Sequence, residues 1–145
     1  MAQRVLNALT AAGVAPTIIA RDDRLADLAP VLVEPTDAPR HPLNGVLAGL
    51  DALAPDEAAL FVPCDLPWIP AEAFARLLTA GAPAVAHDGD RPHPLVALYP
   101  ASWRQRVADA LAASASARSV AADAVLVKMP EAWLKNVNRR SDLRY

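Results

Sequence analysis

Short apolar segments alternate with helical ones along the chain, and this alternation limits the fold more than any other feature of the sequence. The apolar segments are continuous, which is typical of strands covered by helices on both faces. Strands separated by helices of about this length predict βαβ units and a largely parallel sheet in an α/β domain. The segments predicted as strands are 17–20, 31–33, 59–63 and 124–129, with two further strands around a polar turn within 83–99. The segments predicted as helices are 2–12, 22–29, 46–53, 71–79 and 101–114.

Turn and cap residues mark several boundaries between these segments. Gly13 stands where a C-terminal cap of the first helix belongs. Asp22 is suited to cap the N-terminus of the second helix. The composition of residues 35–45 predicts a loop. Gly89 supplies the conformational freedom needed in the turn between the two strands of 83–99.

The composition excludes several classes of protein. A chain of 145 residues is long enough for one domain with a substantial core, and no apolar stretch reaches the roughly 20 residues that span a bilayer. The net charge of −2 gives no basic excess for nucleic acid, and the polar residues of the first segment argue against a signal peptide. The one cysteine, Cys64, cannot form an intrachain disulfide, and we expect it to be packed in the core. These features predict a cytoplasmic protein that binds neither nucleic acid nor membrane.

Polar residues follow several of the predicted strands. Because the carboxyl ends of parallel strands share one edge of a sheet, these side chains can converge there. Together they suggest a carboxylate and amide site for Mg²⁺ with a phosphorylated substrate, since hard oxygen ligands suit that ion. Each residue also has an ordinary explanation as a helix cap, a solvated strand end or a turn former, and the pattern alone leaves both readings open. The residues are Asp22, Glu34, Asp65, Asn136 and Asn138.

Other common sites have no support in the sequence. The spacing of His41, His87 and His93 matches no structural zinc site. A serine hydrolase would need a nucleophile elbow such as G-x-S-x-G, and none is present. Neither the dinucleotide-binding glycine pattern nor the P-loop pattern occurs.

Four motifs stand in an order and spacing that resemble a known family. They are "NGVLAGLDAL" (44–53), "FVPCDLPWIP" (61–70), "AHDGDRPHPLVALYP" (86–100) and "LKNVNRRSDL" (134–143). Together they resemble the MobA-type molybdenum cofactor guanylyltransferases, and the resemblance extends over essentially all 145 residues. It implies a single domain, 1–145, with the three-layer Rossmann-like nucleotidyltransferase fold. It also implies an enzyme that transfers GMP from GTP to molybdopterin and releases pyrophosphate.

The resemblance assigns roles to individual residues. Asp65 would be the catalytic residue that holds Mg²⁺ on the nucleotide phosphates. Gly45, Leu47 and Gly49 would bring the backbone of a helix start close to the nucleotide. The residues expected on the guanine side are Asp22 and Glu34, with Asp37 as the alternative to Glu34. The residues expected on the molybdopterin or metal side are His93, Asn136 and Asn138.

The main departure from the family is at the start of the chain. The family begins with a strand and a glycine-rich phosphate loop, whereas Met1 here aligns within the first helix. We therefore expect an N-terminally truncated domain, inactive as it stands. Unpaired edges at 17–20 and 59–63 would favour self-association. Two alternatives remain, namely cytidylyl transfer to molybdopterin and a non-catalytic paralogue that binds a nucleotide or a partner protein.

Overall fold

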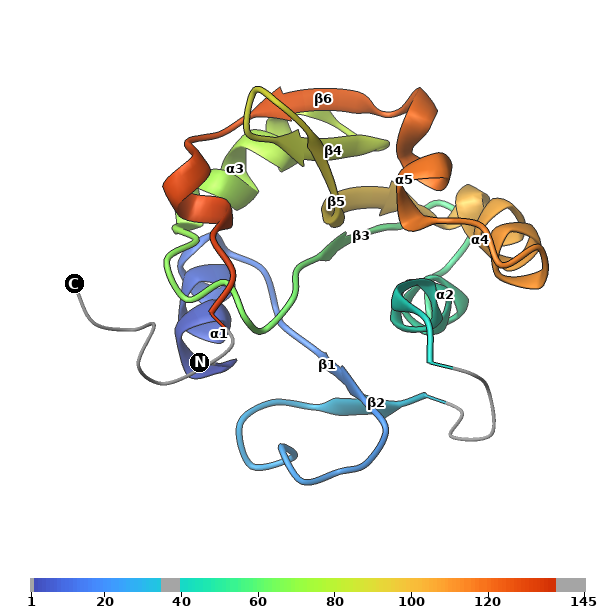
Figure 1. Cartoon of the computed structure of the whole chain (residues 1–145). Coiled ribbons are helices and arrows are strands. Elements are labelled where there is room, and N and C mark those ends of the chain that lie inside the picture. The colour runs from blue at the N-terminus through green and yellow to red at the C-terminus, as the bar shows by residue number, and fades with distance from the viewer. Residues whose placement is uncertain (1, 35–39, 138–145) are drawn as a thin grey trace.

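The computed structural model describes residues 2–34 and 40–137. Figure 1 shows helices on both sides of a sheet, with a separate two-stranded pair below it. The elements are α1 (Ala2–Ala11), β1 (Ile18–Ala20), β2 (Val31–Val33), α2 (Pro42–Asp51), β3 (Ala58–Phe61), α3 (Ala71–Ala80), β4 (Ala84–His87), β5 (Pro92–Pro100), α4 (Arg104–Ala112), α5 (Ala117–Val120) and β6 (Val125–Lys128). Short 3₁₀ helices cover Ala101–Trp103, Ala121–Asp123 and Glu131–Leu134.

The strands form two sheets, of which the larger has mixed direction. The larger sheet has the order β3-β5-β4-β6, and the smaller one pairs β1 with β2 in parallel. Strand β5 is antiparallel to both of its neighbours, while β4 and β6 are parallel, so β3, β4 and β6 run in the same direction. The α/β class is confirmed, and the reversal of β5 follows from the short hairpin that joins it to β4, as predicted for 83–99.

Helices cover both faces of the larger sheet, which makes three layers (Figure 1). On β5, Val96 and Leu98 point into a core that also contains residues of α1 and α3. Ala97 and Tyr99 point to the opposite face, into a second core built with α2, α4 and α5. Because both faces of the strand are buried, the strand has no polar alternation, which is why its sequence is continuously apolar.

The first helix forms for the reasons that its sequence suggests. In α1, the residues Val5, Leu6 and Leu9 share one face and are buried. Gly13 follows the helix with φ of 82°, a left-handed conformation that glycine adopts without strain. The predicted C-terminal cap is therefore confirmed. None of the described helices has both the length and the apolar character needed to cross a bilayer.

An apolar cavity, which we call the slot, separates the two sheets. Its volume is about 560 Å³, and α1, β1, α2 and β3 all contribute to its walls. Among the described residues no strand lies between β1 and β3, so the segments 17–20 and 59–63 have facing edges that no strand pairs. This agrees with the edges predicted from the sequence.

Residues 22–29 do not form the predicted helix. The structure has turns there, and Asp22 accepts hydrogen bonds from the backbone N–H and the side-chain Nε of Arg24, at 3.0 and 2.9 Å. Leu25 and Leu28 are 37% and 43% exposed, so they have no core to pack against. A single helical turn without tertiary packing does not offset the cost of helix nucleation.

Three other predictions from the sequence are corrected. Helix α2 begins at Pro42 and not at residue 46, because His41 caps it and proline is favoured in the first turn. Residues Ala117–Val120 form a short helix that the sequence did not predict. Cys64 is exposed and lies at the slot, whereas a packed core position was expected.

Candidate functional site

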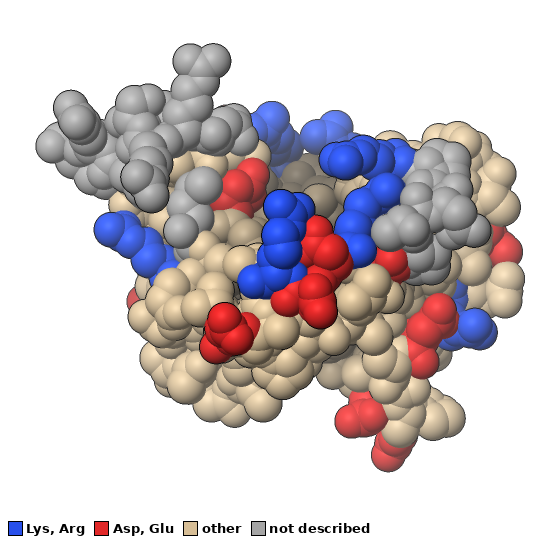
Figure 2. Space-filling view, turned by 90° about the horizontal axis from the view of Figure 1, so that it is seen from below, with Lys and Arg blue, Asp and Glu red and all other residues tan. Residues whose placement is uncertain are grey.

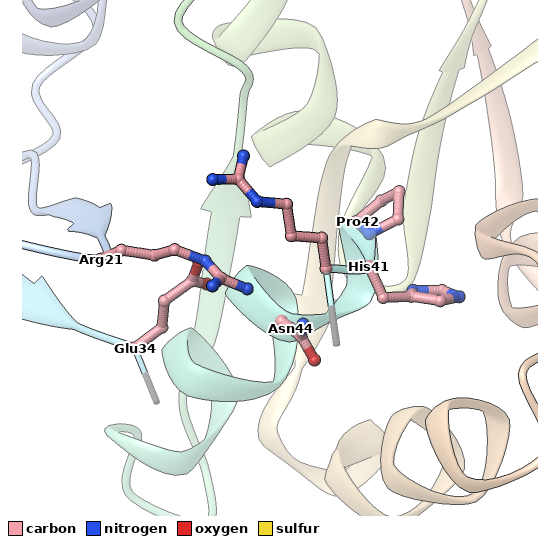
Figure 3. Close-up of a pocket in the computed structure, with 6 residues that line it drawn as sticks. Arg21, Glu34, His41, Pro42 and Asn44 are labelled. Atoms are coloured by element: carbon pink, nitrogen blue, oxygen red, sulfur yellow. The ribbon is translucent and has the colours of Figure 1, made fainter. Parts of the chain in front are cut away.

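A cavity of about 450 Å³ lies where the carboxyl ends of β1 and β2 meet the start of α2. We call it the strand-end cavity. Figure 3 shows the side chains that line it, which come from the two strand ends and from the first turn of the helix. The residues are Arg21, Glu34, Arg40, His41, Pro42 and Asn44.

The two strand ends contribute a pair of opposite charges. Arg21 directly follows β1, and Glu34 directly follows the neighbouring β2. Because the strands are parallel and in register, these residues meet at one edge, and Arg21 Nε lies 3.5 Å from Glu34 Oε1. Both side chains are mostly shielded from solvent, at 27% and 16% exposed. The carboxylate is therefore held in place while one side of it faces the cavity (Figure 3).

The start of α2 is fixed by His41. Its Nδ1 accepts a hydrogen bond from the backbone N–H of Leu43 at 3.0 Å, and its Nε2 donates to the carbonyl oxygen of Ala115 at 2.9 Å. These two bonds require a neutral ring with the proton on Nε2. They anchor the positive end of the helix dipole at the cavity, which favours a bound anion.

Arg40 strengthens the preference of the strand-end cavity for an anion. Arg40 is exposed at the cavity and makes no ion pair within the described ranges, 2–34 and 40–137. On the face seen from below, basic side chains lie beside acidic ones around a hollow (Figure 2). A phosphate group entering the strand-end cavity would meet Arg40 and the N-terminal end of α2 together.

Asp65 occupies a different strand end, after β3. Its Oδ1 is fully buried and has no hydrogen-bond partner among the residues that the structure describes. The carbonyl oxygen of Asp65 accepts from the backbone N–H of Val137 at 2.8 Å, so the exposed Asn136, next to Val137 in the sequence, lies near the backbone of Asp65 in space. Asn138 lies outside the described residues.

A magnesium ion fits this aspartate. A buried carboxylate oxygen without a donor is costly unless a cation or a proton donor reaches it. No cluster of three or more His, Cys, Asp or Glu side chains in the described part of the chain forms a ready-made metal cage. Magnesium is commonly bound by one or two carboxylates together with substrate phosphates and water, so a single aspartate is compatible with it.

The glycines and the leucine predicted at the nucleotide have different surroundings. A Cβ on Gly45 would lie 3.8 Å from Glu34 Oε2, so this glycine is beside the strand-end cavity. A Cβ on Gly49 would lie 2.6 Å from Phe61 Cε1, so Gly49 is required for packing on β3. The nucleotide-binding role expected for Gly49 stays a prediction. Leu47 is partly buried against the second core.

His93 is held within the hairpin. Its Nε2 donates to Asp88 Oδ2 at 3.0 Å, and the backbone N–H groups of Asp90 and Arg91 donate to Asp88 Oδ1 at 2.9 and 3.0 Å. The hydrogen bond from His93, followed by those from the backbone, holds the pKa of Asp88 well below its usual range. The expected contact of His93 with substrate stays a prediction.

The structure does not place every predicted residue in the strand-end cavity. Asp22 pairs with Arg24 and is not among the lining residues, and its expected position beside the base stays a prediction. Asp37 lies outside the described residues. Conversely, Arg21, Arg40 and His41 were missed as site residues. For Arg40 and His41, the available signal is His41-Pro42 as a helix start, which puts the preceding arginine at a helix N-terminus.

Sequence comparison relates this chain to a family and to curated proteins. The family model described as "MobA-like NTP transferase domain" matches residues 1–129. The molybdenum cofactor guanylyltransferase of Rhodopseudomonas palustris (strain HaA2) is 42% identical over 91 residues, covering 56% of this chain and 42% of that protein. The protein of the same name from Pasteurella multocida is 41% identical over 76 residues, covering 49% and 40%. The matches thus span well under half the length of these relatives.

Solved structures share the fold at lower identity. A protein from Aquifex aeolicus VF5 superposes with a TM-score of 0.81 at 21% identity, covering 95% of this chain and 78% of its own. The molybdopterin-guanine dinucleotide biosynthesis protein A of Archaeoglobus fulgidus superposes with a TM-score of 0.70 at 18% identity, covering 97% and 80%. These superpositions confirm the Rossmann-like nucleotidyltransferase fold predicted from the sequence.

Proposed function

Because this chain belongs to the family of MobA-like NTP transferase domains, we propose that it acts in guanylyl transfer from GTP to molybdopterin, with release of pyrophosphate. The curated relatives named molybdenum cofactor guanylyltransferase support this choice of substrates. The observation that carries the proposal is the strand-end cavity, where a shielded carboxylate and a helix N-terminus with a nearby arginine face one space.

The carboxylate of Glu34 is suited to guanine. The Watson–Crick edge of guanine presents two adjacent N–H donors, and a carboxylate can accept from both. Cytosine presents one donor there beside acceptors, which a carboxylate repels. The ion pair with Arg21 orients the carboxylate of Glu34, which supports guanine over cytosine.

The basic side of the cavity is suited to phosphate. Arg40 supplies a charged donor, and the start of α2 supplies backbone N–H groups aligned with the helix dipole. These groups would together contact the phosphates of the nucleotide.

Asp65 is the residue that we assign to Mg²⁺. When bound, the ion would neutralise charge on the phosphates and orient the one that is transferred. The chain itself contributes a buried carboxylate on a backbone that is fixed by Val137. The exposed Asn136, next to Val137, would contact the acceptor substrate.

Nucleotide binding tests the proposal directly. Calorimetry with GTP and CTP in the presence of Mg²⁺ should give a preference for GTP that Glu34→Gln removes. Arg40→Ala should lower the affinity for both nucleotides by on the order of tenfold, as expected for loss of one charge-assisted bond. Arg24→Ala is the matched control, because Arg24 is exposed, pairs with Asp22 and is not among the residues that line the cavity. Equal binding of GTP and CTP by the unmodified chain would contradict a guanylyl donor.

Transfer itself distinguishes the enzyme from a binding protein. Incubation with molybdopterin, GTP and Mg²⁺ should release pyrophosphate in proportion to the guanylated product. Binding of GTP without release of pyrophosphate, at concentrations that saturate the site, would favour the non-catalytic alternative.

A further inference from the structure

The first backbone donors of α2 are bonded to a single residue, His41. Pro42 has no N–H to offer. The N–H of Leu43 donates to the ring Nδ1 of His41, and the N–H of Asn44 donates to the carbonyl oxygen of His41, each at 3.0 Å. An anion that enters the strand-end cavity therefore competes with His41 for the N–H of Leu43.

The bond from Leu43 depends on the protonation state of the ring. Nδ1 accepts a hydrogen bond only while it carries no proton, because a histidine ring with both nitrogens protonated has two donors and no acceptor. A proton on Nδ1 would face the N–H of Leu43, and two such donors separate unless an acceptor comes between them. An oxygen atom of an anion is an acceptor that both groups can reach.

The ring is anchored at the cavity in both states. Its Nε2–H donates to the carbonyl oxygen of Ala115 at 2.9 Å, and Nε2 remains a donor when Nδ1 is protonated. The turn that carries this carbonyl is itself held, since the N–H of Ala115 donates to Ala110 at 2.8 Å. Figure 3 shows the ring at the start of α2, beside the other residues of the cavity. Protonation therefore changes what the ring offers while the ring stays attached.

Helix α2 remains packed when its cap opens. Leu43, in the first turn, is fully buried in the second core. At the other end of the helix, Asp51 accepts a hydrogen bond from Arg104 of α4. Loss of the bond to the ring thus releases the N–H of Leu43 without removing the contacts that hold the helix.

His41 is the one histidine among the described residues that line the cavity. Histidine changes its charge between about pH 5 and 8, whereas the neighbouring Arg21 and Arg40 stay charged throughout that range. Glu34, the carboxylate at the cavity, is paired with Arg21. The turn between α4 and α5, residues 113–116, contains only alanine and serine. The charged residues of α4 and α5 are Arg104, Arg106, Asp109 and the exposed Arg118, of which the first three contact Asp51, Asp123 and Gln105.

We propose that His41 controls anion binding at the strand-end cavity through its own protonation. The neutral ring occupies the N–H of Leu43, and the protonated ring releases that N–H and donates to the anion beside it. The inference rests on the proposed function in that the anion concerned is a phosphate of the nucleotide. Because the proton and the anion bind together, each strengthens the binding of the other by the same factor.

Inorganic sulfate is the probe for this effect. It keeps its charge over this range of pH, whereas phosphate groups titrate near about pH 6. The affinity for sulfate, measured by NMR on the amide of Leu43 at constant ionic strength, should rise by on the order of tenfold from about pH 8 to about pH 5.5, as expected for one added charge-assisted hydrogen bond. At saturating sulfate, the titration of the His41 ring resonances should move to higher pH, which is the reciprocal effect.

Three variants separate the ring from the overall charge of the protein. His41→Asn keeps an acceptor for the N–H of Leu43 but cannot be protonated, so its affinity for sulfate should not rise as the pH falls. His87→Asn is the matched control, because His87 also accepts a backbone N–H, that of Gly89, and does not line the cavity. It should keep the tenfold rise. Arg40→Ala should lower the affinity at both pH values and leave their ratio unchanged.

Three results would overturn the proposal. An equal rise in His41→Asn would assign the effect to overall charge, and weaker binding of sulfate at low pH would show that the protonated ring disrupts the helix start. An amide of Leu43 that responds to sulfate at neither pH would exclude this N–H as a donor to the anion. If His41→Asn does not fold, the titration of the ring with and without sulfate in the unmodified chain still decides the question.

The proposed function and the role of His41 fail separately. A preference for GTP over CTP, with an affinity for sulfate that does not depend on pH, would leave the guanylyl donor in place and remove the role of His41. The expected dependence on pH, with equal binding of GTP and CTP, would support the role of His41 and contradict the guanylyl donor.

Discussion

The backbone N–H of Val137 donates to the carbonyl oxygen of Asp65 at 2.8 Å. This bond joins the loop after β3 to a C-terminal segment more than seventy positions away in the sequence. Val137 is fully buried, so the contact is part of the core and not a surface contact. The carboxylate of Asp65 therefore projects from a backbone held at both the strand and the C-terminal segment.

Replacing Asp65 with asparagine should abolish Mg²⁺-dependent guanylyl transfer and leave the fold intact. Asparagine removes the negative charge that we propose binds the ion. It also removes the cost of burying a charged carboxylate oxygen that has no donor among the described residues. The melting temperature without metal should thus be unchanged or higher, and its increase on adding Mg²⁺ and GTP should disappear. Asp27→Asn, at an exposed position within the turns of 22–29, is the control. Near-normal turnover of Asp65→Asn would remove Asp65 from the site.

Alanine at Gly49 and at Gly45 should have opposite effects on stability. At Gly49 the new methyl group would meet Phe61 at 2.6 Å, and overpacking of this kind costs about 1–3 kcal/mol. At Gly45 the nearest atoms are at 3.7 and 3.8 Å, so alanine should add up to about 1 kcal/mol through helix propensity. Urea denaturation measures both changes. Adding Phe61→Leu to Gly49→Ala should restore part of the loss, and a failure to do so would exclude this contact as the cause.

Loss of the imidazole at position 41 should destabilise the domain through the start of α2. His41→Ala removes the cap to Leu43 and the bond to Ala115, with an expected cost of about 1–3 kcal/mol in the free energy of unfolding. His41→Asn should restore the cap to Leu43 but not the bond to Ala115. Its free energy of unfolding should therefore lie between those of the unmodified protein and His41→Ala. Denaturant unfolding at neutral pH checks this order. Equal stability of all three proteins would show that the ring does not anchor the helix.

The hairpin should lose stability in acid because of Asp88. The bond from His93 and two backbone N–H groups lower the pKa of this carboxyl in the folded state. The unfolded chain then binds the proton first, so the stabilisation is complete above about pH 4 and is lost as the pH falls through the folded pKa. Asp88→Asn should flatten the pH dependence of unfolding in this range, whereas Asp90→Asn should not. An unchanged profile for Asp88→Asn would contradict the assignment.

The layers of the fold were predictable because each buried strand has apolar residues on both faces. On β4, Ala84 and Ala86 lie in one core and Val85 lies in the other, so the strand appears in the sequence as a continuous apolar run. The segment 22–29 shows the limit of such patterns, since it has helical spacing but Leu25 and Leu28 meet no core. Whether a spaced set of leucines is buried depends on the tertiary structure around it.

The candidate site was predictable only where one residue carried the signal. Asp65 was found because a strand and two prolines surround it, although nothing in the sequence shows that its Oδ1 lacks a partner. Arg40 was missed because its position depends on where α2 starts, and the histidine cap that sets this start bonds to Ala115, far along the chain. Long-range contacts of this kind leave no local pattern.

Helix α2 connects the strand-end cavity to the slot. His41 caps it at the strand-end cavity, and Gly49, about two turns later, lies against both walls of the slot. A substitution at Gly49 that moves the helix therefore also moves the N-terminal N–H groups that face the cavity. A glycine that does not line the cavity thus helps to set its geometry.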